Sequence, residues 1–443
     1  MANPDPTLST GPQLWEKAKT LIPGGNQLLS KRTERFLPGL WPAYYSKAKG
    51  CEIWDLDNRH YYDFAQMGVG SCILGYADDD VNAAVTRAIE LGSMSTLNCR
   101  EEVDLTELLL ELHPWAEMAR YARSGGEACA IAVRIGRAAS GKSGVAFCGY
   151  HGWHDWYIAA NIGDESGLDD HLLPGLLPGG VPRSLKGTAF PFDYNKIESL
   201  EALMEKHGHE IGVIIMEPER NMAPDPAYLR AVRDVATKHG AVLIFDEVTS
   251  GFRMNCGGIH LLHGVEPDLA VFGKGMSNGF PLAAVLGRRA VMEHALNTFI
   301  SSTYWTERIG FTAALAALNK FRKLDVSAQL IKHGRHIIDG LAAAANRQGI
   351  PLHITGIEPL IYLRFDLGEA GVAQTYFAQE MLAKGYLAGG AIYTTLAYTP
   401  EIIDQFLAAA EEVLAAMKAH HDQGDLKAQL QGDVIHAGFK RLT

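Results

Sequence analysis

The stretch from Ala241 to Ala284 constrains the fold of this 443-residue chain more than any other part of it. It contains two short apolar runs, Ala241 to Phe245 and Leu269 to Phe272, each closed by charged residues or glycine. Such runs are typical of buried strands, because the strands of a parallel sheet are covered on both faces. A helical pattern from Pro226 to His239, ended by Gly240, leads directly into the first run. This part of the chain therefore predicts a β-α-β unit.

Two further apolar runs, Gly144 to Cys148 and Gly212 to Met216, have the same character. Right-handed crossovers would set the four strands side by side in one mostly parallel sheet. Residues with reactive or stacking side chains follow the strand ends: Tyr150, Glu217, Asp246 and Lys274. Open α/β sheets bind ligands beyond the carboxyl ends of their strands. Taken alone, a carboxylate and an amine there favour a structural salt bridge at a sheet edge over a ligand site.

A helix is predicted from Ser124 to about Ser140. Ser124 and Glu127 have the spacing of a capping box, and Gly125 and Gly126 lie between them. The glycines let another group approach the backbone closely, and the free N–H groups of a helix N-terminus form a site for an anion such as phosphate.

Composition excludes several classes of function. The net charge is −11, from 40 basic and 51 acidic residues, which disfavours a nucleic-acid or anionic-membrane partner. No apolar run approaches the ~18 residues of a membrane span. The six cysteines form no C-x-x-C pair, and the N-terminus lacks the pattern of a secretory signal, so we expect reduced thiols and a cytoplasmic protein. His151 and His154 have no HExxH partner motif, and no metal site is expected.

One cofactor would use all of these groups together. A lysine amine can form a Schiff base with an aldehyde, a carboxylate can hold a protonated ring nitrogen, an aromatic side chain can stack on a ring, and a glycine-rich helix start can hold a phosphate. Pyridoxal 5′-phosphate carries the aldehyde, the pyridine nitrogen, the flat ring and the phosphate. The residues therefore predict a site for pyridoxal 5′-phosphate.

Eight stretches of the chain resemble those of a known family. The stretches that carry the resemblance are collinear and run from about Pro23 to Leu414: PGGNQLLSKR, KGCEIWDLDNRHYYDF, SGGEACAIAVRIGR, GYHGWHD, IIMEPERNM, LIFDEVTSGFR, PDLAVFGKGMSNGFPLAA and LAYTPEIIDQFLAAAEEV. They are similar to class III (fold-type I) pyridoxal-phosphate-dependent aminotransferases, in the branch of glutamate-1-semialdehyde aminomutase. The resemblance implies an α/β fold with a large domain on a mostly parallel, seven-stranded sheet and a smaller α/β domain. We expect an N-terminal segment at 1–70 that packs with the small domain, the cofactor domain at 71–320, and the small domain at 321–443.

The resemblance also implies roles for individual residues. Lys274 would form the Schiff base and move the proton, and Asp246 would pair with the pyridine nitrogen. The other expected cofactor contacts are Val248 and Tyr150 on the two ring faces, the amides of Gly125 and Gly126 on the phosphate, Asn221 near the ring hydroxyl, and Thr303 on the phosphate of the neighbouring subunit. Glu217 would orient its neighbours. The partner contact implies a homodimer with shared active sites.

The chain departs from the family pattern at three places. Gly126 replaces a threonine, which removes one side-chain hydroxyl from the phosphate site. Gly390 stands where the aminomutases carry a glutamate of the substrate pocket, which favours an aminotransferase over the alternative, an aminomutase or amino-acid racemase. Arg308 could bind a substrate carboxylate, or Glu307 beside it could neutralise it. The substrate itself depends on Ser30 to Trp41, the loop at 161–186 and the segment at 303–308.

Overall fold

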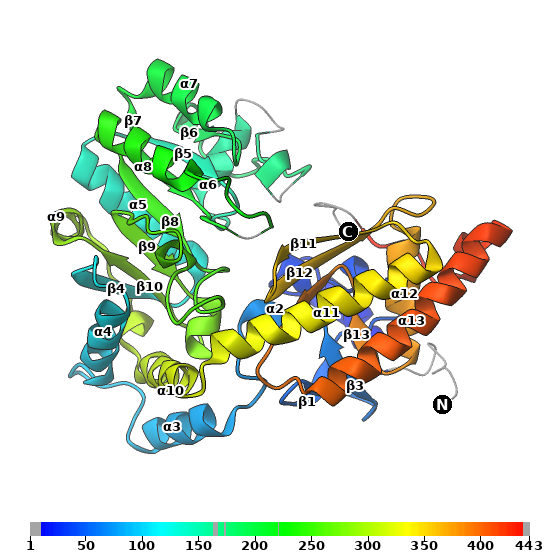
Figure 1. The fold of residues 1–443 in the computed structure, drawn as a ribbon. Coiled ribbons are helices and arrows are strands. Elements are labelled where there is room, and N and C mark those ends of the chain that lie inside the picture. Colours follow the sequence, from blue (N-terminus) through cyan, green and yellow to red (C-terminus); the bar gives the residue numbers. More distant parts are fainter. Residues whose placement is uncertain (1–9, 163–166, 172–173, 220, 437–443) are drawn as a thin grey trace. The chain divides into compact units, whose positions relative to one another are not determined.

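The computed structural model describes residues 10–162, 167–171, 174–219 and 221–436. The chain divides into two compact units (Figure 1). One runs from Asp79 to Ser327, and we call it the sheet unit. The other combines the described residues up to Asp78 with those from Ala328 onward, and we call it the terminal unit.

The sheet unit is built on a seven-stranded sheet. In spatial order its strands are β4 (Met118–Ala122), β10 (Ala283–Gly287), β9 (Leu269–Phe272), β8 (Val242–Asp246), β7 (Ile211–Met216), β5 (Gly144–Cys148) and β6 (Ala189–Pro191). β10 is antiparallel to both of its neighbours, and the other contacts between strands are parallel. The four strands predicted from apolar runs, β5, β7, β8 and β9, lie side by side, which confirms the mostly parallel sheet.

Both faces of this sheet are covered by helices. Alternate residues of a strand point to opposite faces, so one strand packs in two separate clusters. Val213 and Ile215 of β7 pack in one cluster with α5 (Gly125–Ser140). Ile214 and Met216 of the same strand pack in a second cluster with α7 (Ile197–His207) and α8 (Tyr228–His239). Burial on both faces explains why these strands are apolar almost throughout, and it holds their carboxyl ends in fixed register.

The remaining α-helices described in the sheet unit are α3 (Asp79–Glu90), α4 (Glu101–Leu112), α6 (Asp155–Ile158), α9 (Arg289–Met292) and α10 (Arg308–Leu324). Each end of α10 is defined by a recognisable signal. Glu307 is its N-cap, with a side chain that accepts a hydrogen bond from the amide of Ile309, and Asp325 ends it in the left-handed conformation.

The terminal unit has two smaller sheets. One orders β1 (Tyr45–Lys49), β2 (Glu52–Asp55), β3 (His60–Phe64) and β13 (Tyr386–Ala388), and the other orders β11 (Leu352–Ile357), β12 (Leu360–Phe365) and β14 (Ala391–Tyr393). Its helices are α1 (Thr10–Leu21), α2 (Met67–Gly70), most of α11 (Val326–Gln348), α12 (Val372–Ala383) and α13 (Pro400–Gln423). Phe64 is at the centre of its core, with ring centroids 4.0 Å from Phe406 and 4.5 Å from Tyr398. Among the described helices, none has both the length and the apolar content needed to cross a membrane.

Candidate active site

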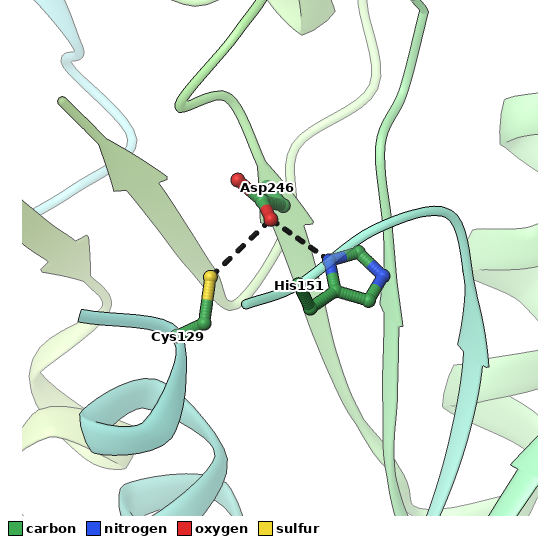
Figure 2. A group of neighbouring side chains, drawn as sticks. All are labelled: Cys129, His151 and Asp246. Atoms are coloured by element: carbon green, nitrogen blue, oxygen red, sulfur yellow. Dashed lines mark hydrogen bonds and ion pairs between the residues drawn. The ribbon is translucent and has the colours of Figure 1, made fainter. Parts of the chain in front are cut away.

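Asp246 is the last residue of β8, and its buried carboxylate is held by three groups of the chain. Oδ1 accepts a hydrogen bond from the amide of Val248 at 3.1 Å. Figure 2 shows that Cys129 and His151 approach the same oxygen from opposite sides: Cys129 Sγ is 3.2 Å and His151 Nδ1 is 2.8 Å from Oδ2. These contacts fix the carboxylate's orientation at the carboxyl end of the sheet.

His151 bridges Asp246 and the backbone of the preceding strand. Its Nε2 lies 3.1 Å from the carbonyl oxygen of Cys148, which can only accept a hydrogen bond. Burial opposes ionisation of Asp246, but the hydrogen bond and charge of His151 outweigh it and hold the pKa of Asp246 below its usual value.

The same three side chains offer ligand atoms that lie within 4.8 Å of one another, as in a metal site. A metal would need the thiolate form of cysteine. Burial, followed by the charge of Asp246, raises the pKa of the Cys129 thiol well above its usual value. In this structure Cys129 and His151 both contact the Asp246 carboxylate at hydrogen-bond distance.

Lys274 follows β9, and its amine reaches back to the turn after β8. Its Nζ donates a hydrogen bond to Thr249 Oγ1 at 2.6 Å. The Lys274 backbone is in the left-handed region, with a φ of 42°. A residue other than glycine pays about 1–3 kcal/mol for such a conformation, and strain of this kind concentrates at functional sites. The structure thus brings Asp246 and Lys274 to one turn, although the two side chains form no salt bridge with each other among the described contacts.

The start of α5 forms a cradle suited to a phosphate. Ser124 and Glu127 make the predicted capping box, and within the described chain the amides of Gly125 and Gly126 have no acceptor. A Cβ on Gly152, whose φ is +100°, would lie 2.8 Å from the Cα of Gly126, so the loop after β5 passes directly over the helix start. Free amides beside glycine backbone fit an anion.

Val248 links this cradle to the lysine. A Cβ built on Gly125 would lie 2.8 Å from Val248 Cγ1, and one built on Gly273 would lie 3.5 Å from the same atom. The valine side chain therefore lies between the helix start and the backbone that precedes Lys274. An apolar side chain flanked by free amides, a buried carboxylate and an amine fits a flat ring that carries a phosphate, a basic nitrogen and an aldehyde.

The other predicted residues differ in their contacts with the site. Tyr150 is half-exposed beside the site, and its amide donates to Glu217 Oε2 at 3.2 Å, which gives Glu217 an orienting contact. Asn221 is exposed after β7, and no hydrogen bond among the described residues connects it to the rest of the site. Thr303 is exposed in a short 3₁₀ turn, Thr303–Thr306. Their expected contacts, with the ring hydroxyl and with the neighbouring subunit's phosphate, stay predictions.

Arg308 pairs with a residue that neither alternative included. Arg308 bonds Glu101, with Nε at 3.0 Å and Nη2 at 2.9 Å from the same carboxylate oxygen. Glu307 caps α10 instead, and its carboxylate lies 3.6 Å from Nη2 of Arg123. The described ion pairs therefore join Arg308 to Glu101 and Glu307 to Arg123.

Glu247 supports the site turn from behind, through a buried polar network. Its Oε1 accepts from the amide and ring Nδ1 of His260 at 2.9 and 2.7 Å, and its Oε2 accepts from Ser250 at 2.5 Å. Burial opposes ionisation, but these hydrogen bonds hold the pKa of Glu247 below its usual value. His113 extends the network, because its Nε2 accepts from the amide of Gly258 at 2.9 Å.

His113 makes stability depend on pH. Burial lowers its pKa to about 4 from 6.5. Above pH 6.5 both states are neutral, whereas between pH 6.5 and 4 only the unfolded chain gains the proton. The folded state should therefore lose up to about 3 kcal/mol over this range. A His113→Gln variant, which does not titrate, should show a shallower fall in melting temperature from pH 7 to 4.5 than the natural protein. Parallel curves would contradict the assignment.

Three residues of the site were not predicted from the sequence as cofactor-site residues: Cys129, His151 and Thr249. Cys129 lies one helical turn after Gly125, and Thr249 lies three residues after Asp246. Those spacings were the available signals, because they place Cys129 and Thr249 within about one turn of residues that the resemblance assigns to the cofactor.

Comparison with known proteins identifies the family. A family model for class-III aminotransferases matches residues 39–408. A 3-aminobutyryl-CoA aminotransferase of Cloacimonas acidaminovorans is 33% identical over 92% of this chain and 99% of its own. A glutamate-1-semialdehyde 2,1-aminomutase of Syntrophobacter fumaroxidans is also 33% identical, over 91% of this chain and 97% of its own. The FumI protein of Sphingopyxis sp. MTA144, solved in a form with PLP, has a TM-score of 0.85 at 25% identity and covers 95% of this chain and 98% of its own. The buried carboxylate, the strained lysine and the glycine cradle agree with this match, and the chain belongs to the class-III aminotransferases, a family of enzymes that depend on pyridoxal phosphate.

Proposed function

We propose that Lys274 forms the Schiff base through which this enzyme moves an amino group from an amine or amino-acid donor to a keto-acid or aldehyde acceptor. The observation that carries the proposal is the turn after β8, which contacts both Asp246 and the amine of Lys274. The cofactor, when bound, withdraws electrons from the substrate carbon that loses its proton.

The residues of the chain supply the rest of the chemistry. Asp246 would accept a hydrogen bond from the protonated ring nitrogen, and its negative charge would keep that nitrogen protonated. In a loaded site, Val248 and Tyr150 would contact opposite ring faces, the amides of Gly125 and Gly126 would hold the phosphate, and Asn221 would approach the ring hydroxyl. Lys274, once the donor amine has displaced it, takes up the proton of the substrate carbon and delivers it to the carbon that receives it.

A donor panel tests the proposed function. The purified protein loaded with pyridoxal phosphate is mixed with α-amino acids, β-amino acids and simple amines, and the absorbance band of the bound cofactor is followed. The β-amino compounds are included because one relative is a 3-aminobutyryl-CoA aminotransferase. An active donor should bleach the band, and a keto acid should restore it. A protein that no donor bleaches would rule out amino-group transfer.

The second candidate is an isomerase, either an aminomutase or an amino-acid racemase, and its support is the similarity to a glutamate-1-semialdehyde aminomutase. By the family resemblance, the aminomutase glutamate corresponds to about Gly390 in this chain, and its loss weighs against an aminomutase. Product formed from glutamate-1-semialdehyde, or from one amino-acid enantiomer, without any keto acid would favour the isomerase.

We further propose that the active enzyme is a homodimer. Large apolar side chains are exposed on the sheet unit: Trp153, Leu296, Phe299 and Tyr304. Trp153 and Phe299 line an open groove of about 590 Å³ together with Trp305 and His154. Exposed apolar surface of this kind marks interaction sites, and a second copy would bring Thr303 to the neighbouring cofactor. All six cysteines are free thiols, which supports work in a reducing compartment such as the cytoplasm.

Mixed dimers give a direct test of the contact across subunits. A Thr303→Val variant should lose activity, and Lys274→Ala should be inactive. If Thr303 acts in the partner's site, a dimer of one Lys274→Ala and one Thr303→Val subunit holds one intact site and one doubly altered site. Reassorting equal amounts should then restore about a quarter of the wild-type activity, because half of the dimers are mixed. No gain over the Thr303→Val protein alone would show that Thr303 does not act across the interface.

A further inference from the structure

The hydroxyl of Thr249 contacts the amine of Lys274, and the roles described so far leave this contact unused. We propose that Thr249 is a positioning residue that holds the amine of Lys274 during proton transfer, in the part of the reaction when the amine is not bonded to the cofactor. The inference rests on the proposed function, because it concerns how the released lysine reaches the substrate carbon.

The position of this hydroxyl is fixed. Thr249 is buried, and its carbonyl oxygen accepts a hydrogen bond from Nε of Arg253 at 2.6 Å, from a side chain that is itself fully buried. On the preceding residue, the amide of Val248 is bonded to Asp246. The same short turn therefore holds the carboxylate for the ring nitrogen and the hydroxyl for the lysine. The backbone of that turn therefore sets the distance between the Asp246 carboxylate and the Thr249 hydroxyl.

A hydroxyl suits a lysine that changes its protonation state. It has one donor and two acceptor lone pairs, so it can accept from an ammonium and donate to a neutral amine. A carboxylate in this place would favour the ammonium and hinder proton uptake. Over one half-reaction the lysine takes one proton from the substrate carbon and gives one proton to the receiving carbon. Thr249 keeps its own proton throughout, and no bond to it forms or breaks.

A pair of variants isolates the hydroxyl. Thr249→Val has nearly the same shape and lacks the hydroxyl, whereas Thr249→Ser keeps it. With the best donor from the panel, Thr249→Val should lower kcat by about 10- to 100-fold, the range expected for a lost hydrogen bond to a charged group. KM should stay within about threefold of wild type, because Thr249 positions the lysine and not the substrate. The isotope effect for a donor deuterated at the reacting carbon should rise as proton transfer becomes slower, and Thr249→Ser should restore both values.

A second measurement does not depend on turnover. Apoprotein is mixed with pyridoxal phosphate, and the formation of its bond to the lysine is followed by absorbance over a range of pH. Thr249→Val should slow this step by about tenfold at neutral pH, since the amine is no longer held in place. Thr237→Val is the matched control, because it makes the same change at an exposed threonine on α8, whose hydroxyl bonds the carbonyl oxygen of Arg233 instead of the lysine. It should leave the linking rate unchanged.

These experiments distinguish a failure of the proposed function from a failure of the role of Thr249. If the wild-type protein responds to no donor in the panel, the proposed function fails. If the wild type is active while Thr249→Val keeps the wild-type isotope effect and linking rate, only the role of Thr249 is overturned. A Thr249→Ser variant as impaired as Thr249→Val would also overturn it, because the hydroxyl would then not be the group that matters.

Discussion

Replacing Lys274 by alanine is expected to lower kcat for amino-group transfer by about 10⁴-fold, the upper range for a lost acid–base group. The reason is that one side chain serves both as the attachment point of the cofactor and as the carrier of the proton. The structure holds this amine on Thr249, and its backbone has a strained φ of 42°. The measurement is a steady-state assay with the best donor, combined with mass spectrometry of the borohydride-reduced protein.

The mass measurement makes the prediction specific to one position. In the natural protein the cofactor should be attached to the peptide that contains Lys274, and in Lys274→Ala no peptide should carry it. Lys418→Ala on α13 is the control, because that lysine pairs with Asp422 on the surface of the terminal unit. A Lys274→Ala protein that still transfers amino groups at more than about a tenth of the wild-type rate would refute the assignment.

Replacing Asp246 by asparagine should lower kcat by roughly 10²- to 10³-fold, the range measured for the loss of one preorganised electrostatic contact. The amide has nearly the same shape but cannot keep the ring nitrogen protonated. The variant should also be less stable by about 1–3 kcal/mol, because it loses the hydrogen bond between His151 and the Asp246 carboxylate. Activity, cofactor affinity and melting temperature measure these effects separately.

A double variant separates the two roles of this carboxylate. His151→Asn removes the buried ring that is left without its carboxylate partner, so Asp246→Asn combined with His151→Asn should recover much of the lost melting temperature. The double variant should remain as inactive as Asp246→Asn alone, because neither change returns a carboxylate to the ring nitrogen. Recovery of activity together with stability would mean that Asp246 acts through folding alone.

Local sequence patterns were sufficient for the elements that are buried on both sides or clearly capped. The strands β5, β7, β8 and β9 were predicted because parallel strands covered by helices are continuously apolar. The start of α5 was predicted from the capping box of Ser124 and Glu127, which the structure contains. β4, β6 and β10 were not predicted as strands. β10 has the sequence AAVLG, whose alanines and glycine have low strand propensity, and it forms because β4 and β9 pair with it on both sides.

The sequence by itself determined the cofactor and the family of this protein. Asp246, Lys274 and the glycines of α5 occur in motifs whose spacing can be recognised in one sequence. Only the tertiary structure decided what each of these residues contacts. Cys129 and His151 share one oxygen of Asp246, Thr249 holds the amine of Lys274, and Arg308 is neutralised by Glu101. The physical reason is that a hydrogen bond depends on angles and distances of a few tenths of an ångström, which arise from packing between segments far apart in the chain.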